Sequence, residues 1–310
     1  MDGGAESRFG RVFSGPRLEG LIPSGRDADV TAWAQDVYAR AIERGLDHIP
    51  DHVAIIQDGN RRYARERGID TDSGHTAGAE TARDVLQWGR DLGVTETTLY
   101  AFSTENFERP PEERAALFDL IAEELRALAD DGRIHADGVK VRTIGHIDRL
   151  PERVQAAIET VESATDEYSR YTLNVALAYG GREVLRSAAK RIAEEAATGA
   201  LDPQAVDRET IGERLYDRSF REVDLLIRSG GECRTSNFLP WHAVGAEAPF
   251  VVVDSYWPAF SRLDLLRALT AYDTHRATHE RRRRGTRLSL PSRSRQLSRI
   301  ARSAMYSFRR

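Results

Sequence analysis

Six short apolar runs alternate with longer segments of helical periodicity, and this alternation limits the fold more than any other feature of the chain. The runs are rich in Val, Ile and Leu, and each has the length of one buried strand: His52–Gln57, Glu96–Ser103, Val139–Gly145, Tyr171–Ala178, Val223–Ser229 and Phe250–Tyr256. The helical segments are His75–Leu92, Pro111–Asp130, Pro151–Ser169, Arg182–Ala197 and Ser261–His279. The pattern predicts one α/β domain with a mainly parallel six-stranded sheet flanked by helices.

The two ends of the chain differ from this central part. Residues 1–27 are rich in Gly, Ser, Pro and Arg and predict a flexible leader, so that residues 28–285 form the domain. Apolar residues at helical spacing between Val30 and Ala41 predict a further helix, which Gly45 would end. Residues 286–310 are basic and place an apolar stripe on one helical face. Such a tail can lie on an anionic membrane surface, but a disordered tail or a helix docked on the domain is an equally open interpretation.

Charge is unevenly distributed along the chain. The net charge is -4, yet residues 271–310 carry twelve Arg against two acids, which leaves 33 basic and 47 acidic residues before them. An acidic body argues against nucleic acid as the main partner. The single Cys233 suits a reducing compartment, and the first residues contain no apolar segment typical of a secretory signal. We therefore expect a cytoplasmic protein that can associate with a membrane through its tail.

An acid and two arginines directly follow the first predicted strand, in the order Asp58-Gly59-Asn60-Arg61-Arg62. Asp-Gly-Asn favours a turn, and the carboxyl ends of parallel strands are where open α/β sheets bind ligands. One carboxylate can hold Mg²⁺, and guanidinium groups can fork onto phosphate oxygens. An isolated Asp-Gly-Asn is more often an ordinary polar turn, so the interpretation depends on the other strand ends.

Those strand ends carry residues of the same kind. Segments 103–109, 228–238 and 255–260 follow three other strands and add Arg109, Arg228 and Arg234 to the set. Gly230 and Gly231 allow backbone N–H groups to approach an anion, and the Ser236 hydroxyl is a further donor. This many guanidiniums with Asp58 suit two diphosphates and a Mg²⁺ ion. The apolar faces of two adjacent helices could hold a hydrocarbon tail above which these groups lie.

Six segments of the chain, taken in order, resemble segments of the cis-prenyltransferases, the family of undecaprenyl and dehydrodolichyl diphosphate synthases. Arg61 and Tyr63 make the first of them resemble archaeal members of that family. The segments are HVAIIQDGNRRYA, GHTAG, TLYAFSTENFERP, TLNVALAYGGR, DLLIRSGGECRTSNFLPW and SYWPAF. The resemblance covers about residues 48 to 285.

The resemblance implies a Mg²⁺-dependent enzyme that condenses isopentenyl diphosphate onto an allylic diphosphate, farnesyl or geranylgeranyl. The product would be a long-chain polyprenyl diphosphate for lipid glycan carriers, made by a homodimer whose apolar tunnel opens at the carboxyl ends of the strands. Its implied catalytic residues are Asp58, Asn60, His75 and Asn106, and its implied metal ligands are Asp58 and Glu247. Its implied substrate-binding residues are Gly59, Arg61, Arg62, Tyr63, Ser103, Glu105, Phe107, Arg109, Arg228, Arg234 and Ser236.

One departure from the family pattern concerns the allylic diphosphate. Thr71 stands where the family commonly has an arginine, so Arg61, Arg65 or Arg67 would have to supply that charge. The alternative function is a noncatalytic partner subunit of a heteromeric cis-prenyltransferase. Such subunits lose the metal aspartate, whereas Asp58 is present here.

Overall fold

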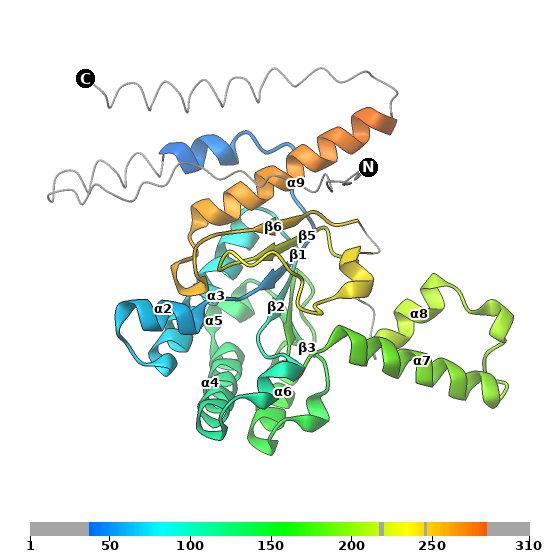
Figure 1. Cartoon of the computed structure of the whole chain (residues 1–310). Coiled ribbons are helices and arrows are strands. Elements are labelled where there is room, and N and C mark those ends of the chain that lie inside the picture. The colour runs from blue at the N-terminus through cyan, green and yellow to red at the C-terminus, as the bar shows by residue number, and fades with distance from the viewer. Residues whose placement is uncertain (1–36, 217–219, 245–246, 284–310) are drawn as a thin grey trace, which may run out of the picture.

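A six-stranded, wholly parallel sheet forms the centre of the molecule, with strand order β3-β4-β2-β1-β5-β6 (Figure 1). The computed structural model describes residues 37–216, 220–244 and 247–283. Its strands are β1 His52–Ile56, β2 Glu96–Tyr100, β3 Val139–Ile144, β4 Tyr171–Ala176, β5 Leu225–Arg228 and β6 Phe250–Val252. The predicted α/β fold with a parallel six-stranded sheet is confirmed. The predicted leader and basic tail lie outside the described residues.

Every strand is shorter than its apolar run. The difference is largest in the last strand, which ends at Val252 and not at Tyr256. In the second strand the backbone amides of Ala101 and Phe102 both donate to the carbonyl of Ala176, so the regular ladder ends after Tyr100. The apolar residues beyond that point, such as Phe102, are still buried. Apolar content therefore marked burial correctly but overestimated strand length.

The helices lie between the strands as predicted, with three additions. Their bounds are α2 Asn60–Arg67, α3 Thr71–Asp91, α4 Pro111–Asp130, α5 Gly132–Ala136, α6 Glu152–Thr165, α7 Gly181–Ala197, α8 Arg208–Leu215 and α9 Arg262–Arg283. Residues 37–43 are also helical, within the segment predicted before Gly45. Among the additions, α2 begins at Asn60, so the predicted turn at Asp58–Asn60 is only a bend that leads directly into a helix.

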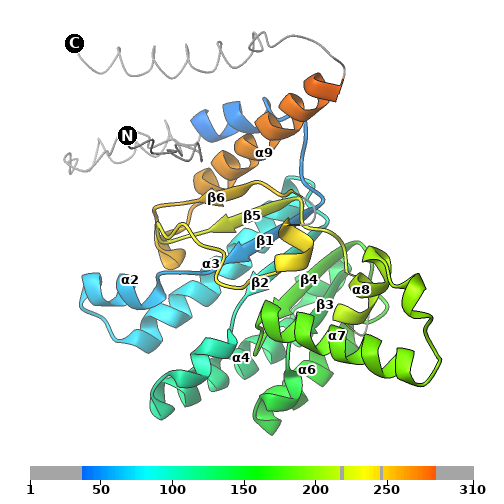
Figure 2. The same ribbon diagram turned by 45° about the vertical axis from the view of Figure 1, so that its right-hand side comes forward.

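Two apolar layers cover the sheet, one on each face (Figure 2). Along β1 the side chains alternate, so Val53 and Ile55 join the layer with α3, α4, α6 and α9, whereas Ala54 and Ile56 face α7 and the segment 238–244. Figures 1 and 2 show α7 and α8 extending together beyond the sheet. No helix in the described ranges has the length and apolar content needed to cross a bilayer.

The strand order places the predicted functional segments next to one another. β1 lies between β2 and β5, with Ile56 in register with Tyr100 on one side and Arg228 on the other. Because the strands are parallel, their carboxyl ends share one edge, and the segments after Ile56, Tyr100 and Arg228 converge there.

Candidate active site

The turn between β1 and α2 is fixed by close backbone contacts. Gly59 has φ of 108°, a conformation that favours glycine, and a Cβ atom on it would stand 2.7 Å from Cδ1 of Tyr256. The amide of Asp58 donates to Ser229 Oγ at 2.9 Å, and that hydroxyl donates to the carbonyl of Asp58 at 2.8 Å. These contacts hold the Asp58 side chain at the carboxyl edge of the sheet.

Asp58 accepts from two guanidinium groups that come from different elements. Arg228 Nη2 lies 2.7 Å from Oδ2, and Arg62 Nη2 lies 3.1 Å from Oδ1. The Arg228 side chain is only 4% exposed, and its Nη1 also donates to Ser236 Oγ and to the carbonyl of Arg234, each at 2.6 Å. Arg62 donates to the carbonyl of Gly230 at 2.9 Å. A single carboxylate thus ties α2 to β5 and the loop that follows it.

His75 and Arg109 form a second cluster beside Asp58. Arg109 Nη1 donates to Glu113 at 2.9 Å and lies 3.5 Å from His75 Nε2. Burial, followed by the positive charge of Arg109, lowers the pKa of His75, so the imidazole is neutral at pH 7. Its Nδ1 is buried and has no hydrogen-bond partner among the described residues. The imidazole therefore meets Arg109 through Nε2, and its buried Nδ1 does not reach the ligand space.

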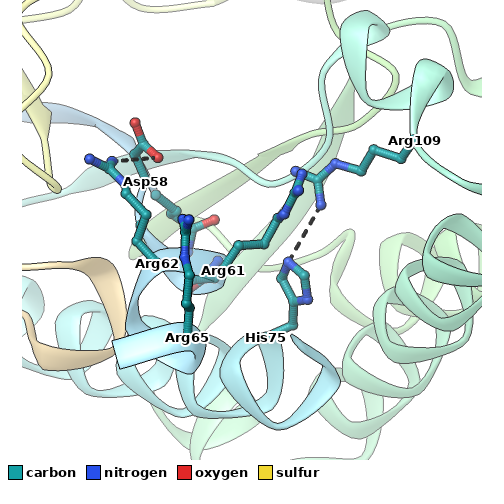
Figure 3. A pocket seen from close by; sticks show the side chains of 9 residues that line it. Asp58, Arg61, Arg62, Arg65, His75 and Arg109 are labelled. Carbon is teal, nitrogen blue, oxygen red and sulfur yellow. Dashed lines mark hydrogen bonds and ion pairs between the residues drawn. The ribbon is translucent and has the colours of Figure 1, made fainter. Parts of the chain in front are cut away.

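These groups line a cavity of about 290 Å³ at the carboxyl edge (Figure 3). Its lining comprises Gln57, Asp58, Gly59, Asn60, Arg61, Arg62, Arg65, His75 and Arg109. Figure 3 shows Arg61, Arg62 and Arg65 rising from α2 toward the same opening as Arg109. Four guanidiniums against one carboxylate make the cavity strongly positive, which suits a ligand with several phosphate charges.

The predicted loop residues other than Arg109 do not line this cavity. Segment Thr104–Glu108 is a turn of 3₁₀-helix, with Ser103 as its N-cap and the Asn106 side chain accepting from the Ser103 amide at 2.9 Å. Phe107 packs on the rings of Phe102 and Phe118, and the guanidinium of Arg149 stacks on it at 4.4 Å. Glu105 is exposed.

Four further residues named from the sequence also lie outside the cavity lining. Arg234 pairs with Glu232 at 3.5 Å, and its side chain is 68% exposed. Tyr63 stacks under the guanidinium of Arg67. Thr71 is the first residue of α3, and Glu247 lies in an exposed turn. The predicted gathering of Asp58 with four arginines therefore holds for Arg62, Arg109 and Arg228, whereas Arg234 points to solvent.

Sequence reasoning did not assign Gln57, Glu113 or a definite role for Arg65, all of which belong to the site. Two of them follow an assigned arginine by four residues: Arg65 follows Arg61, and Glu113 follows Arg109. Arg61 and Arg65 both lie in α2, where this spacing places them on one helical face, so a helix beginning at Asn60 would have revealed Arg65. Arg109 precedes α4, and only Glu113 lies in that helix.

The protein side chains at the cavity supply only part of the ligands that Mg²⁺ needs. No group of three or more His, Cys, Asp or Glu side chains in the described ranges is arranged to hold a metal ion. Mg²⁺ is, however, usually bound through one or two carboxylates together with substrate phosphates and water. Asp58, whose side chain is 27% exposed at the positive cavity, meets that requirement.

A parallel sheet with an acid and several guanidiniums at its carboxyl edge is the framework of an α/β enzyme that handles phosphorylated substrates. A family model described as "Putative undecaprenyl diphosphate synthase" matches residues 56–282. The chain belongs to this cis-prenyltransferase family and is a prenyltransferase, which confirms the archaeal-like resemblance.

Individual relatives agree with this assignment. The tritrans,polycis-undecaprenyl-diphosphate synthase (geranylgeranyl-diphosphate specific) of Halobacterium salinarum is 53% identical over 257 residues, or 83% of this chain and 85% of the relative. The protein of the same name from Methanocaldococcus jannaschii is 46% identical over 240 residues, or 76% of this chain and 85% of the relative. A solved structure of lavandulyl diphosphate synthase from Lavandula x intermedia, in complex with dimethylallyl diphosphate, has a TM-score of 0.67 and 32% identity. It matches 73% of this chain and 95% of that one.

Proposed function

We propose that the enzyme condenses isopentenyl diphosphate onto geranylgeranyl diphosphate, or onto farnesyl diphosphate, and makes a long-chain polyprenyl diphosphate for lipid glycan carriers. The observation that carries the proposal is the positive cavity around Asp58 in a chain whose curated relatives are named as geranylgeranyl-specific synthases. The charged residues around the cavity suit this reaction, because a diphosphate must first bind there and then leave with extra negative charge.

In the proposed reaction the bond between the allylic carbon and its diphosphate oxygen breaks, and the electron pair stays on the oxygen. The isopentenyl double bond then bonds to the allylic carbon, and a proton and pyrophosphate are released as the new cis double bond forms. Arg61, Arg62 and Arg109 are positioned to bind the allylic diphosphate through the cavity. His75 lines the same cavity and is proposed to assist the departure of the diphosphate.

Arg228 pairs with the carboxylate oxygen of Asp58 that Arg62 does not contact, and it also donates to Ser236. These two residues form the proposed site for the isopentenyl headgroup. Asp58 is the proposed ligand of Mg²⁺. When bound, the ion would neutralise charge on the departing diphosphate. Glu247, Arg234 and the loop residues Ser103, Glu105, Asn106 and Phe107 would have to approach the cavity with substrate present.

A direct assay tests the proposal. Purified full-length protein is incubated with radiolabelled isopentenyl diphosphate, Mg²⁺ and each primer in turn, and the products are sized. Label in long polyprenyl chains that disappears on chelation is the expected result, with the higher rate on geranylgeranyl diphosphate. Absence of incorporation with every primer contradicts the proposal.

We also propose that the enzyme acts as a homodimer and that residues 286–310 contact anionic membranes. Light scattering measures the mass of the complex. Sedimentation with vesicles containing anionic lipid, compared between the full chain and a chain ending at Gly285, measures the contribution of the tail. A monomeric active enzyme, or equal sedimentation of both chains, contradicts the respective proposal.

A further inference from the structure

The cavity contains more guanidinium charge than the surrounding side chains neutralise. Arg62 is paired with Asp58, and Arg109 is paired with Glu113. Arg61 approaches Glu113 only at 3.8 Å, and its side chain is 59% exposed. Arg65 also lines the cavity, and its guanidinium makes no hydrogen bond or ion pair with the residues that the structure describes. Arg65 is thus a charge at the site that lacks a partner within the described chain.

The neighbours of Arg65 in the last turn of α2 are engaged elsewhere. The guanidinium of Arg67 stacks on the Tyr63 ring at 4.3 Å, and Glu66 accepts a hydrogen bond from the Tyr256 hydroxyl at 2.5 Å. Neither of them lines the cavity. Arg65 is therefore the charged residue of this turn whose side chain reaches the ligand space.

The placement of Arg65 has an energetic cost that an anion would remove. Arg61 and Arg65 are four residues apart on one helical face, and like charges at this spacing destabilise a helix. A diphosphate between the two guanidiniums would replace that repulsion by charge-assisted hydrogen bonds. The same helix face lines the cavity together with Asp58 and His75, whereas Arg228 and Ser236 do not belong to that lining.

We propose that Arg65, acting with Arg61, binds the diphosphate of the allylic primer and sets the affinity of the enzyme for it. The assignment rests on the proposed function, because it takes the cavity lined by α2 as the primer site. Arg65 contributes to ground-state binding, so its loss affects primer affinity more than turnover.

Steady-state kinetics of matched variants test this role. Arg65→Gln is expected to raise KM for geranylgeranyl diphosphate about tenfold, the loss of roughly one charge-assisted hydrogen bond. Both kcat and KM for isopentenyl diphosphate should stay within about twofold of wild type. Arg65→Lys should recover part of the primer affinity. Arg67→Gln, which removes the same charge two residues away, is the control and should match wild type.

Binding of inorganic pyrophosphate gives a second readout that needs no turnover. Pyrophosphate should raise the melting temperature of the wild type and of Arg67→Gln, and should raise that of Arg65→Gln less. If the wild type is active and Arg65→Gln keeps its primer KM, the role of Arg65 is refuted while the proposed function stands. If the wild type incorporates no isopentenyl unit, the proposed function fails, and the role of Arg65 in diphosphate binding is then tested by the pyrophosphate-induced shifts in melting temperature alone. Equal shifts in Arg65→Gln and Arg67→Gln refute that role.

Discussion

Gly78 and Asn60 are in such close contact that α3 packs against the start of α2 only because residue 78 has no side chain. A Cβ atom on Gly78 would lie 2.5 Å from Asn60 Oδ1 and 3.0 Å from Trp257 Cδ1. Trp257 closes the same contact, since its indole Nε1 donates to the carbonyl of Gly78 at 2.7 Å. The position of Asn60 in the cavity is therefore set by a residue one helix away.

Gly78→Ala should reduce kcat/KM on the order of 100-fold, because displacing Asn60 misplaces the start of α2 and the cavity residues that it carries. The loss of stability should be smaller, about 1–3 kcal/mol for an overpacked contact. Gly89→Ala in the same helix is the control: its Cβ would lie at an ordinary 3.6 Å from the Tyr171 hydroxyl, so it should be active and slightly stabilised. Steady-state kinetics and denaturant unfolding of both variants measure the difference in activity and in stability. Near-normal activity of Gly78→Ala would contradict the role of Gly78 in positioning Asn60.

Asp58→Asn should abolish turnover, by on the order of 10³-fold or more, because a neutral amide is a poor Mg²⁺ ligand. Its amide oxygen can still accept from Arg228, so the melting temperature should stay close to that of the wild type. Asp58→Ala should be equally inactive but less stable by about 1–3 kcal/mol, because buried Arg228 loses an acceptor. Product assays and thermal melts distinguish the two. Substantial turnover in either variant would show that Asp58 is not the metal ligand.

Asn106→Ala should loosen the turn that carries Arg109. Its side chain caps the Ser103 amide, and loss of such a cap costs about 1 kcal/mol. Hydrogen exchange of residues 103–109 should therefore become faster, with a lower kcat/KM. Asn106→Asp keeps the accepting oxygen and should keep the slow exchange. If Asn106→Asp is as inactive as Asn106→Ala while its exchange stays slow, the residue acts in the chemistry in addition to its cap.

His242 should make the protein less stable in mild acid. Burial, followed by the neighbouring His52 and Arg208, lowers the pKa of His242 from 6.5 to about 4. Between about pH 6.5 and pH 4 the unfolded chain then binds a proton that the folded chain does not, so stability falls as the pH is lowered through this range. The contribution is up to about 3 kcal/mol. His242→Phe should flatten the pH dependence of the free energy of unfolding. An unchanged slope would contradict the assignment. Burial also lowers the pKa of His52, which adds an effect of the same sign in both proteins.

The sequence predicted the layers of this fold well because strands and helices differ in length and periodicity. All six strands and the five long helices were found, and α4 begins and ends at the predicted residues, Pro111 and Asp130. The helix α2 was missed because its residues NRRYARER carry almost no apolar periodicity and follow a turn-forming Asp-Gly. Its stability comes from tertiary contacts of Ala64 and Tyr256, which a sequence pattern does not contain.

The candidate site was predicted in part for a related reason. Residues next to strand ends, such as Asp58 and Arg228, could be placed because parallel strands share one edge. Arg234 could not be placed, because it lies six residues beyond the end of β5, in an irregular loop with left-handed residues at Ser236 and Asn237. Glu247 and the loop residues 103–108 could not be placed relative to the cavity, because neither the apolar pattern nor the strand order encodes how a loop folds on itself.

Asp58 is the shared anchor of two guanidiniums, one on α2 beside the proposed primer and one on β5 beside the proposed isopentenyl headgroup. A ligand that draws one of these arginines out of its ion pair leaves the Asp58 carboxylate paired with the other arginine alone. If the two substrates bind as proposed, their sites are coupled through Asp58, and thermodynamic linkage requires that each substrate change the affinity for its co-substrate by the same factor.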